Sequence, residues 1–189
     1  MSVVFVQNIS GDQLSKHSKP RIVFPGSFNP LHVGHVELAR VVSEQFAQEV
    51  HFELSIANVD KADLTPDEVN RRVLQFRGFA PVWVTRAARF IEKAMLFPDT
   101  RFLIGHDTAI RLFDVKYYSG DEELRDQALA ELIEMNCSFV VAGRLDREGN
   151  FQVWQSEAAP PRFRELFIAL DEQLFRRDVS STQLRQNVA

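Results

Sequence analysis

Phe-Pro-Gly-Ser-Phe-Asn-Pro-Leu-His-Val-Gly-His-Val-Glu-Leu-Ala-Arg, from Phe24 to Arg40, is the stretch that decides the fold of this chain. A β-prone run over residues 21–24 is broken by Pro25-Gly26, and apolar residues at helical spacing follow from Val36. The pattern predicts a strand, a glycine turn and a helix in direct succession. In an α/β sheet such a connection lies at the carboxyl edge of the strands, where ligands bind.

Two histidines fall at the start of the predicted helix. His32 and His35 are three residues apart, so on the first helical turn they share one face. The backbone N–H groups of that turn have no intrahelical partner and carry a positive partial charge, which favours an anion. Gly34 lacks a Cβ and lets the chain approach a phosphate closely, while Ser27 and Asn29 offer capping or hydrogen-bonding side chains. The segment therefore predicts a phosphate site.

The composition indicates one domain that binds a small ligand. The chain has 189 residues, of which 45% are hydrophobic, and this is enough for one sizeable core. We expect residues 1–20 to form an N-terminal arm and residues 21–189 to form a single domain. The formal net charge of −4 gives no general attraction for nucleic acid, so an anionic ligand must be held by a local cluster.

Cysteine content and hydropathy bear on the cellular setting. The single cysteine, Cys137, excludes an intramolecular disulfide and a multi-cysteine zinc site. The sequence contains no apolar run of about 18 residues, the length that a membrane-spanning helix needs. We therefore expect a cytoplasmic protein without nucleic-acid or membrane partners. The sequence is compatible with a homo-oligomer.

Strand-like and helix-like segments alternate along the chain. The predicted core strands cover residues 21–24, 51–56, 81–84, 101–105 and 138–142, and the predicted helices cover residues 36–48, 65–72, 85–96 and 121–135. Thr65 and Thr85 are expected to cap the second and third helices. This alternation predicts a Rossmann-like, doubly wound α/β fold. We expect a mainly parallel sheet of about five strands with flanking helices, and the first core strand at the switch point.

An acidic residue follows the fourth predicted strand. That strand ends in Gly105, and Asp107 stands just beyond it, at the sheet edge where ligands bind. Its carboxylate can accept hydrogen bonds from the hydroxyl groups of a ligand. A helix cap is the alternative role for this side chain.

The C-terminal region also suits a phosphate. Ser180, Ser181 and Thr182 lie at a predicted helix start, and Arg185 follows on the next turn. Free N–H groups and hydroxyls at a helix start can hold outer phosphates, and an arginine adds a planar charged fork. We expect this segment to bind phosphate, as the histidine motif does.

Three segments carry a resemblance to a known family. Residues 26–35, Gly-Ser-Phe-Asn-Pro-Leu-His-Val-Gly-His, resemble the His-x-Gly-His signature of the nucleotidyltransferase α/β phosphodiesterase superfamily, particularly the nicotinamide and nicotinate mononucleotide adenylyltransferases. Residues 102–107 resemble the Ile-Gly-x-Asp segment of that family, and residues 179–185 resemble its Ile-Ser-Ser-Thr-x-x-Arg motif. The sequence departs from the usual family pattern at Pro25 and Asn29, where glycine and aspartate are common.

The resemblance implies a reaction and a set of site residues. An acceptor phosphate oxygen would attack the α-phosphorus of ATP, with Mg²⁺ bridging the phosphates and no protein nucleophile or dedicated protein metal site. The implied catalytic residues are His32, His35 and Arg185; the implied nucleotide-binding residues are Gly26, Ser27, Phe28, Gly34, Gly105, Asp107, Ser180, Ser181 and Thr182; and the implied acceptor-binding residues are Lys61, Arg71, Arg72 and Trp83.

Alternatives stay open for the function and for single residues. The chain could be a nicotinamide-type mononucleotide adenylyltransferase, a superfamily transferase for another acceptor such as pantetheine phosphate or for a cytidylyl group, or a nucleotide-binding module without catalysis. The intact His32, His35, Ser181 and Arg185 weigh against the last of these. Arg71 and Arg72 could instead belong to a solvated charged helix, and a tryptophan such as Trp83 in an apolar strand is more often a core residue.

Overall fold

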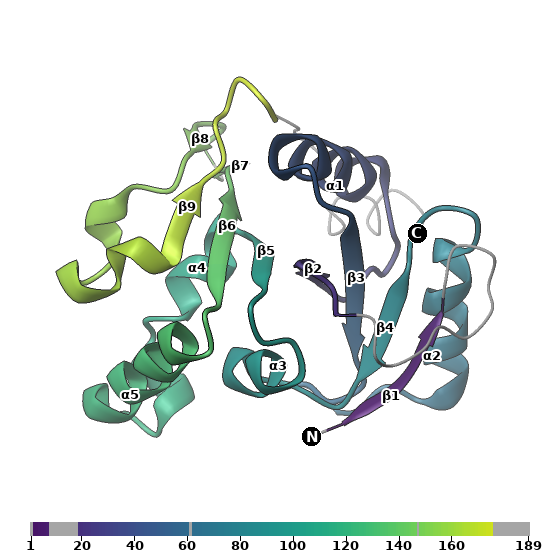
Figure 1. The fold of residues 1–189 in the computed structure, drawn as a ribbon, viewed down its shortest axis with the longest axis horizontal. Coiled ribbons are helices and arrows are strands. Elements are labelled where there is room, and N and C mark those ends of the chain that lie inside the picture. The colour runs from purple at the N-terminus through teal and green to yellow at the C-terminus, as the bar shows by residue number, and fades with distance from the viewer. Residues whose placement is uncertain (1, 8–18, 61, 147, 176–189) are drawn as a thin grey trace.

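A computed structural model of the chain describes residues 2–7, 19–60, 62–146 and 148–175. These residues form a central sheet with helices on both faces (Figure 1). The sheet contains β1 (Val3–Gln7), β2 (Ile22–Pro25), β3 (Val50–Ser55), β4 (Val82–Thr85), β5 (Arg101–Gly105), β6 (Ser138–Ala142) and β9 (Phe167–Ala169), and β7 (Arg144–Leu145) and β8 (Phe151–Gln152) form a separate hairpin. Within the described ranges, the strand order of the central sheet is β1-β4-β3-β2-β5-β6-β9.

The parallel core of the sheet is the predicted Rossmann-like arrangement. The strands β4, β3, β2, β5 and β6 all pair in parallel. From β2 the chain passes to β3 on one side and later to β5 on the other, so β2 lies at the switch point as predicted. The carboxyl ends of β3, β2 and β5 therefore lie next to one another.

Two edge strands extend this core beyond the predicted number of about five. The strand β1 pairs antiparallel with β4 and buries Val6 in the core, so part of the predicted N-terminal arm belongs to the sheet. At the other edge β9 pairs parallel with β6. Both strands are short, and periodicity over so few residues does not separate strand from loop or helix. Residues 8–18 of the predicted arm lie outside the described residues.

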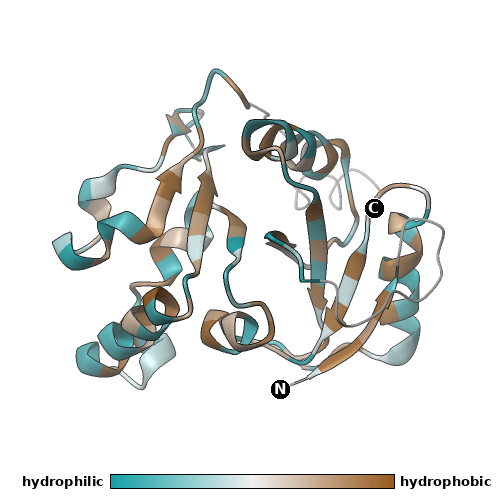
Figure 2. Ribbon diagram, viewed as in Figure 1, coloured by the Kyte–Doolittle hydropathy of each residue, from teal (hydrophilic) through white to brown (hydrophobic). Residues whose placement is uncertain are grey.

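Helices cover the two faces of the sheet with separate apolar clusters. The helices are α1 (Val33–Phe46), α2 (Pro66–Val73), α3 (Phe90–Leu96), α4 (His106–Arg111) and α5 (Glu122–Glu134), with short 3₁₀ turns η1 (Leu74–Phe76), η2 (Val115–Tyr118), η3 (Ser156–Ala158) and η4 (Pro161–Leu166). One cluster includes α1 and α2, and the other includes α3, α4 and α5. Hydrophobic residues are concentrated along the strands, while the helices alternate apolar and polar bands (Figure 2). In the described part of the chain, no helix combines the length and apolar character needed to cross a membrane.

One predicted helix cap is confirmed and one is wrong. Thr65 accepts a hydrogen bond from the backbone of Glu68 at the start of α2, as the sequence predicts. Thr85, however, is the last residue of β4, and α3 begins only at Phe90. The hydroxyl of Thr85 instead donates a hydrogen bond to the buried carboxylate of Glu53.

Candidate nucleotide site

The predicted histidine pair forms at the start of α1. The loop after β2 leads to His32, which is the N-cap of α1, so Ser27 and Asn29 do not cap this helix. The rings of His32 and His35 are stacked, with their centroids 3.7 Å apart and an angle of 23° between their planes. The backbone of Gly34 between them is buried. Both side chains therefore share one face next to the free N–H groups of the first turn, as the spacing predicts.

Hydrogen bonding and burial fix the protonation of these histidines. The backbone N–H of His32 donates to Nδ1 of His35 over 3.3 Å, so the neutral His35 ring carries its proton on Nε2. Burial, together with the neighbouring His32, lowers the pKa of His35 to about 3. Burial also lowers the pKa of His32. At neutral pH His35 is therefore an uncharged donor through Nε2–H. Within the described residues the buried Nδ1 of His32 has no hydrogen-bond partner.

The lowered histidine pKa values predict acid-sensitive stability. Because the pKa of His35 in the folded protein, about 3, lies below its ordinary value of 6.5, the unfolded chain binds more protons between these pH values. The free energy of unfolding should therefore fall as the pH drops below 6.5, by up to roughly 1.4 kcal/mol per pH unit for this group. Burial lowers the pKa of His32 and His51 as well, which adds to the same trend.

Urea denaturation at pH values from 7.5 to 4.5 measures this dependence. The window excludes Glu68, whose pKa is lowered to about 2 by hydrogen bonds from Arg71 and Arg72, because its stabilising contribution is lost only below its ordinary value of 4.5. In a His35→Ala variant the free energy of unfolding should depend on pH less steeply, by about 1 kcal/mol per pH unit. Equal slopes in the two proteins would contradict the burial of an uncharged His35.

Helix α2 and the following turn hold the loop that connects β2 to the histidines. The guanidinium of Arg72 donates to the carbonyl of Ser27 over 2.8 Å. The side-chain amide of Gln75 donates to the carbonyl of Phe28 over 3.0 Å, and its oxygen accepts from the backbone of Leu31 over 2.9 Å. Sequence reasoning missed Gln75, because a lone glutamine carries no motif and its partners lie more than forty residues away.

The two predicted arginines of α2 have different environments. Arg72 is buried, and its guanidinium also donates to Glu68. Arg71 is exposed and donates to Glu68 and, over 2.6 Å, to the side-chain oxygen of Asn29. Both arginines therefore contact the histidine loop, but only Arg72 is buried, and Arg71 lies on the exposed face of α2.

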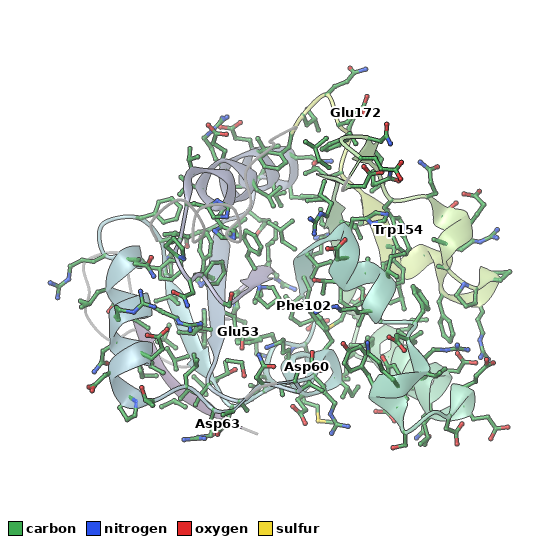
Figure 3. All side chains as sticks on the ribbon, turned by 180° about the vertical axis from the view of Figure 1, so that it is seen from behind. Glu53, Asp60, Asp63, Phe102, Trp154 and Glu172 are labelled. Carbon is green, nitrogen blue, oxygen red and sulfur yellow. The ribbon has the colours of Figure 1, made fainter. Side chains whose placement is uncertain are left out.

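A cleft of about 1010 Å³ opens at the carboxyl edge of β2 and β3. The predicted site residues on its wall are Gly26, Ser27 and Arg72. Its lining also includes three aromatic side chains and two arginines that sequence reasoning missed: Phe90, Tyr117, Tyr118, Arg89 and Arg111. The hydroxyl of Tyr117 lies 3.4 Å from Asp60, which belongs to the loop after β3 (Figure 3). The cleft thus combines flat aromatic surfaces with charges of both signs, since Glu53, Asp60 and Glu131 also line it.

Two predicted ligand-binding side chains are core residues instead. The ring of Phe28 is 1% exposed and packs against Phe24, Phe52 and Phe76. Trp83 is 2% exposed and donates from its indole nitrogen to Nδ1 of His51 over 3.0 Å. Neither ring lines the cleft, and the side chains of Trp83 and Phe28 lie in the core, as the alternative interpretation of Trp83 had it.

The end of β5 keeps the expected open geometry. A Cβ added to Gly105 would meet no atom within 4 Å, so a ligand can approach the backbone there. Gly105 is the N-cap of α4, and Asp107 lies one residue into the helix with an exposed side chain. The carboxylate of Asp107 is paired with Arg144, a residue that sequence reasoning missed. Asp107 is therefore not the helix cap that was its alternative role.

Other predicted site residues cannot be placed. Lys61, Ser180, Ser181, Thr182 and Arg185 lie outside the described residues. Among the residues that the structure does describe, there is no cluster of three or more histidine, cysteine, aspartate or glutamate side chains that could hold a metal ion.

Comparisons with known proteins agree with the geometry. Residues 23–187 match a family described as cytidylyltransferase-like. A candidate nicotinamide mononucleotide adenylyltransferase of Schizosaccharomyces pombe is 24% identical over 193 residues, which cover 94% of this chain and 74% of the relative. Two candidate nicotinate-nucleotide adenylyltransferases match shorter segments. The Bacteroides fragilis protein is 43% identical over 56 residues, 28% of each chain. The Aquifex aeolicus protein is 67% identical over 33 residues, 17% of this chain and 20% of the relative.

Proposed function

Because this chain belongs to the cytidylyltransferase-like family of nucleotidyltransferases, we propose that it transfers the adenylyl group of ATP to the phosphate of nicotinamide or nicotinate mononucleotide. The observation that carries the proposal is the stacked, uncharged pair of His32 and His35 at the start of α1, directly after the switch-point strand. The names of the three relatives support the acceptor.

The proposed reaction is a direct displacement at phosphorus. A phosphate oxygen of the mononucleotide forms a bond to the α-phosphorus of ATP, and the bond from that phosphorus to the bridging oxygen breaks, so that pyrophosphate leaves with the electron pair. Catalysis then consists of positioning the reactants and stabilising the charge on the reacting phosphate. Nε2–H of His35 is the uncharged donor for that charge, and the free N–H groups of α1 add their positive partial charge.

The cleft has the chemistry that a mononucleotide acceptor needs. Aromatic side chains at its wall, Phe90, Tyr117 and Tyr118, offer surfaces for a flat ring. Three arginines line the same wall, Arg72, Arg89 and Arg111, of which Arg72 is paired with Glu68 and Arg89 with Glu92. The acceptor phosphate is assigned to this part of the cleft. The proposed ligand of the ATP ribose is Asp107, which follows β5, and β5 pairs with β2 on the side opposite β3 and β4.

The proposed reaction uses Mg²⁺ bound to ATP. Mg²⁺ prefers oxygen ligands and is commonly held by substrate phosphates and water with few protein groups. We propose that the cation enters with ATP as its phosphate complex. When bound, Mg²⁺ neutralises part of the triphosphate charge.

Cytidylyl transfer is the second candidate, since the family model that matches the chain is described as cytidylyltransferase-like. A pyrophosphate-release assay distinguishes the two. ATP and CTP are each combined with nicotinamide mononucleotide, nicotinate mononucleotide, pantetheine phosphate or choline phosphate, and products are identified by mass. Release with ATP and at least one of the two pyridine mononucleotides, with formation of the dinucleotide, is the expected result. Release with CTP alone would overturn the proposal, and release with no pair would favour a binding module.

A further inference from the structure

A buried ion pair lies at the wall of the cleft. The ammonium of Lys93 in α3 donates to both carboxylate oxygens of Glu53 in β3, over 2.9 and 2.8 Å. The side chain of Glu53 is 0% exposed and that of Lys93 is 6% exposed. The hydroxyl of Thr85, at the end of β4, donates to the same carboxylate. Figure 3 shows Glu53 near the middle of the sheet, among the side chains of the strands.

This arrangement needs an explanation beyond stability. Removing two charges from water costs several kcal/mol per ion, and well-packed apolar side chains in place of a buried pair often stabilise a protein equally well. The face of the sheet that carries Glu53 also carries the apolar residues Val23, Trp83 and Phe102, and the buried His51. Two apolar side chains could therefore fill the space that Lys93 and Glu53 occupy.

The hydrogen bonds of the three residues converge on one backbone position. The third proton of Lys93 is donated to the carbonyl of Ala87 over 2.6 Å. The backbone N–H of Ala87 donates to the hydroxyl of Thr85 over 3.2 Å. Both polar backbone groups of Ala87 are thus held by this cluster. The connection between β4 and α3, residues 86–89, is thereby pinned to the end of β3.

The pinned connection forms part of the cleft. Ala88 and Arg89, next to Ala87, line the cleft together with Glu53 and Lys93. The backbone N–H groups of Ala88 and Arg89 are held from the other side by the carboxylate of Glu92. In the strand order, β4 lies two strands from β2 on the side opposite β5. Asp107, the proposed ligand of the ATP ribose, follows β5, and the acceptor is therefore assigned to the part of the cleft that the connection after β4 lines.

We propose that Lys93, Glu53 and Thr85 are positioning residues that hold residues 86–89 as a wall of the acceptor pocket, and so set the affinity for the mononucleotide rather than for ATP. The inference rests on the proposed function, since it assigns this side of the cleft to the acceptor. The three residues would determine specificity without contacting the acceptor themselves, because they act through residues 86–89.

A matched pair of variants at Thr85 tests the proposal. Thr85→Val keeps the shape of the side chain and removes the hydroxyl, whereas Thr85→Ser keeps the hydroxyl. Thr85→Val is expected to raise KM for the acceptor roughly tenfold, with KM for ATP changed less than about twofold, because a buried hydrogen-bond partner of Ala87 is lost. Thr85→Ser should restore the acceptor KM. Equal rises in both KM values, or no rise in either, would overturn the proposal.

A double variant separates positioning from folding. Lys93→Met alone leaves the carboxylate of Glu53 buried without its partner and is expected to destabilise the protein. The double variant Lys93→Met with Glu53→Gln has no charge left at this position and should therefore fold, which thermal unfolding can check. Its KM for the acceptor should still be raised. An acceptor KM equal to that of the unmodified protein would assign the ion pair to folding alone and overturn the proposal.

Amide hydrogen exchange gives a readout that does not depend on the acceptor. In the double variant without substrates, the amides of residues 87–89 should exchange at least about tenfold faster, while those of β3 and β4 stay protected. Unchanged exchange would overturn the proposal even if the assay shows activity. If the unmodified protein uses neither pyridine mononucleotide, the proposed acceptor is wrong. The exchange experiment then still decides whether the three residues hold the connection.

Discussion

Replacement of His35 by alanine is expected to lower the turnover number of adenylyl transfer by about 10²–10³-fold, the usual cost of removing one donor to a developing charge. The proposal gives His35 this role because its side chain lies on the first turn of α1, stacked on His32. Its proton resides on Nε2, since Nδ1 accepts from the backbone of His32. With a pKa lowered to about 3, the ring stays an uncharged donor throughout the physiological pH range.

Steady-state kinetics at saturating ATP and acceptor measures this effect. An interaction made only in the transition state lowers kcat and kcat/KM together, so KM for both substrates should change little. His35→Gln is the matched control, because its side-chain amide can supply an N–H donor in place of Nε2–H. This variant should retain more turnover than His35→Ala. A His35→Ala protein with unchanged kcat would remove this histidine from the proposed chemistry.

The Asp107→Ala variant is expected to bind ATP about ten- to a hundredfold more weakly with the fold intact. Hydrogen bonds to a charged group are worth roughly 1.5–3 kcal/mol, and the carboxylate of Asp107 can accept them from ribose hydroxyls. The structure leaves this role open, because Gly105 and not Asp107 is the N-cap of α4 and the carboxylate is exposed at the sheet edge. Calorimetric titration with ATP measures the loss.

A 2′-deoxy nucleotide and two further variants identify the interaction. The unmodified protein should bind 2′-deoxy-ATP more weakly than ATP, and Asp107→Ala should lose this preference. Asp107→Asn keeps one oxygen acceptor, so its preference for ATP over 2′-deoxy-ATP should lie between those of the unmodified protein and Asp107→Ala. Arg144→Ala removes the ion-pair partner of Asp107 while leaving its carboxylate, so the preference for ATP should persist. If Asp107→Ala discriminates between the two nucleotides as strongly as the unmodified protein, another group reads the ribose.

The sequence alone determined the features that depend on near neighbours. The break at Pro25-Gly26 and the three-residue spacing of His32 and His35 are local, so they correctly predicted the strand, the loop and the shared helix face. The five parallel core strands and the switch point follow from the alternation of buried strands with helices, because parallel strands require crossover connections. The predictions for Lys61 and for Ser180 to Arg185 remain predictions.

Only the tertiary structure decided which side chains face the cleft and which face the core. An aromatic residue such as Phe28 or Trp83 can contact either a ligand or the core, and the sequence does not distinguish the two. In the structure both side chains pack in the core, against residues that are distant in the sequence. Thr85 has the local signature of a helix cap, yet its hydroxyl is taken by Glu53, 32 residues away. Gln75 acquires its role from a loop 44 residues away. Partners at such separations meet only when the sheet and its helices are assembled, since burial and hydrogen-bond satisfaction are properties of the assembled fold.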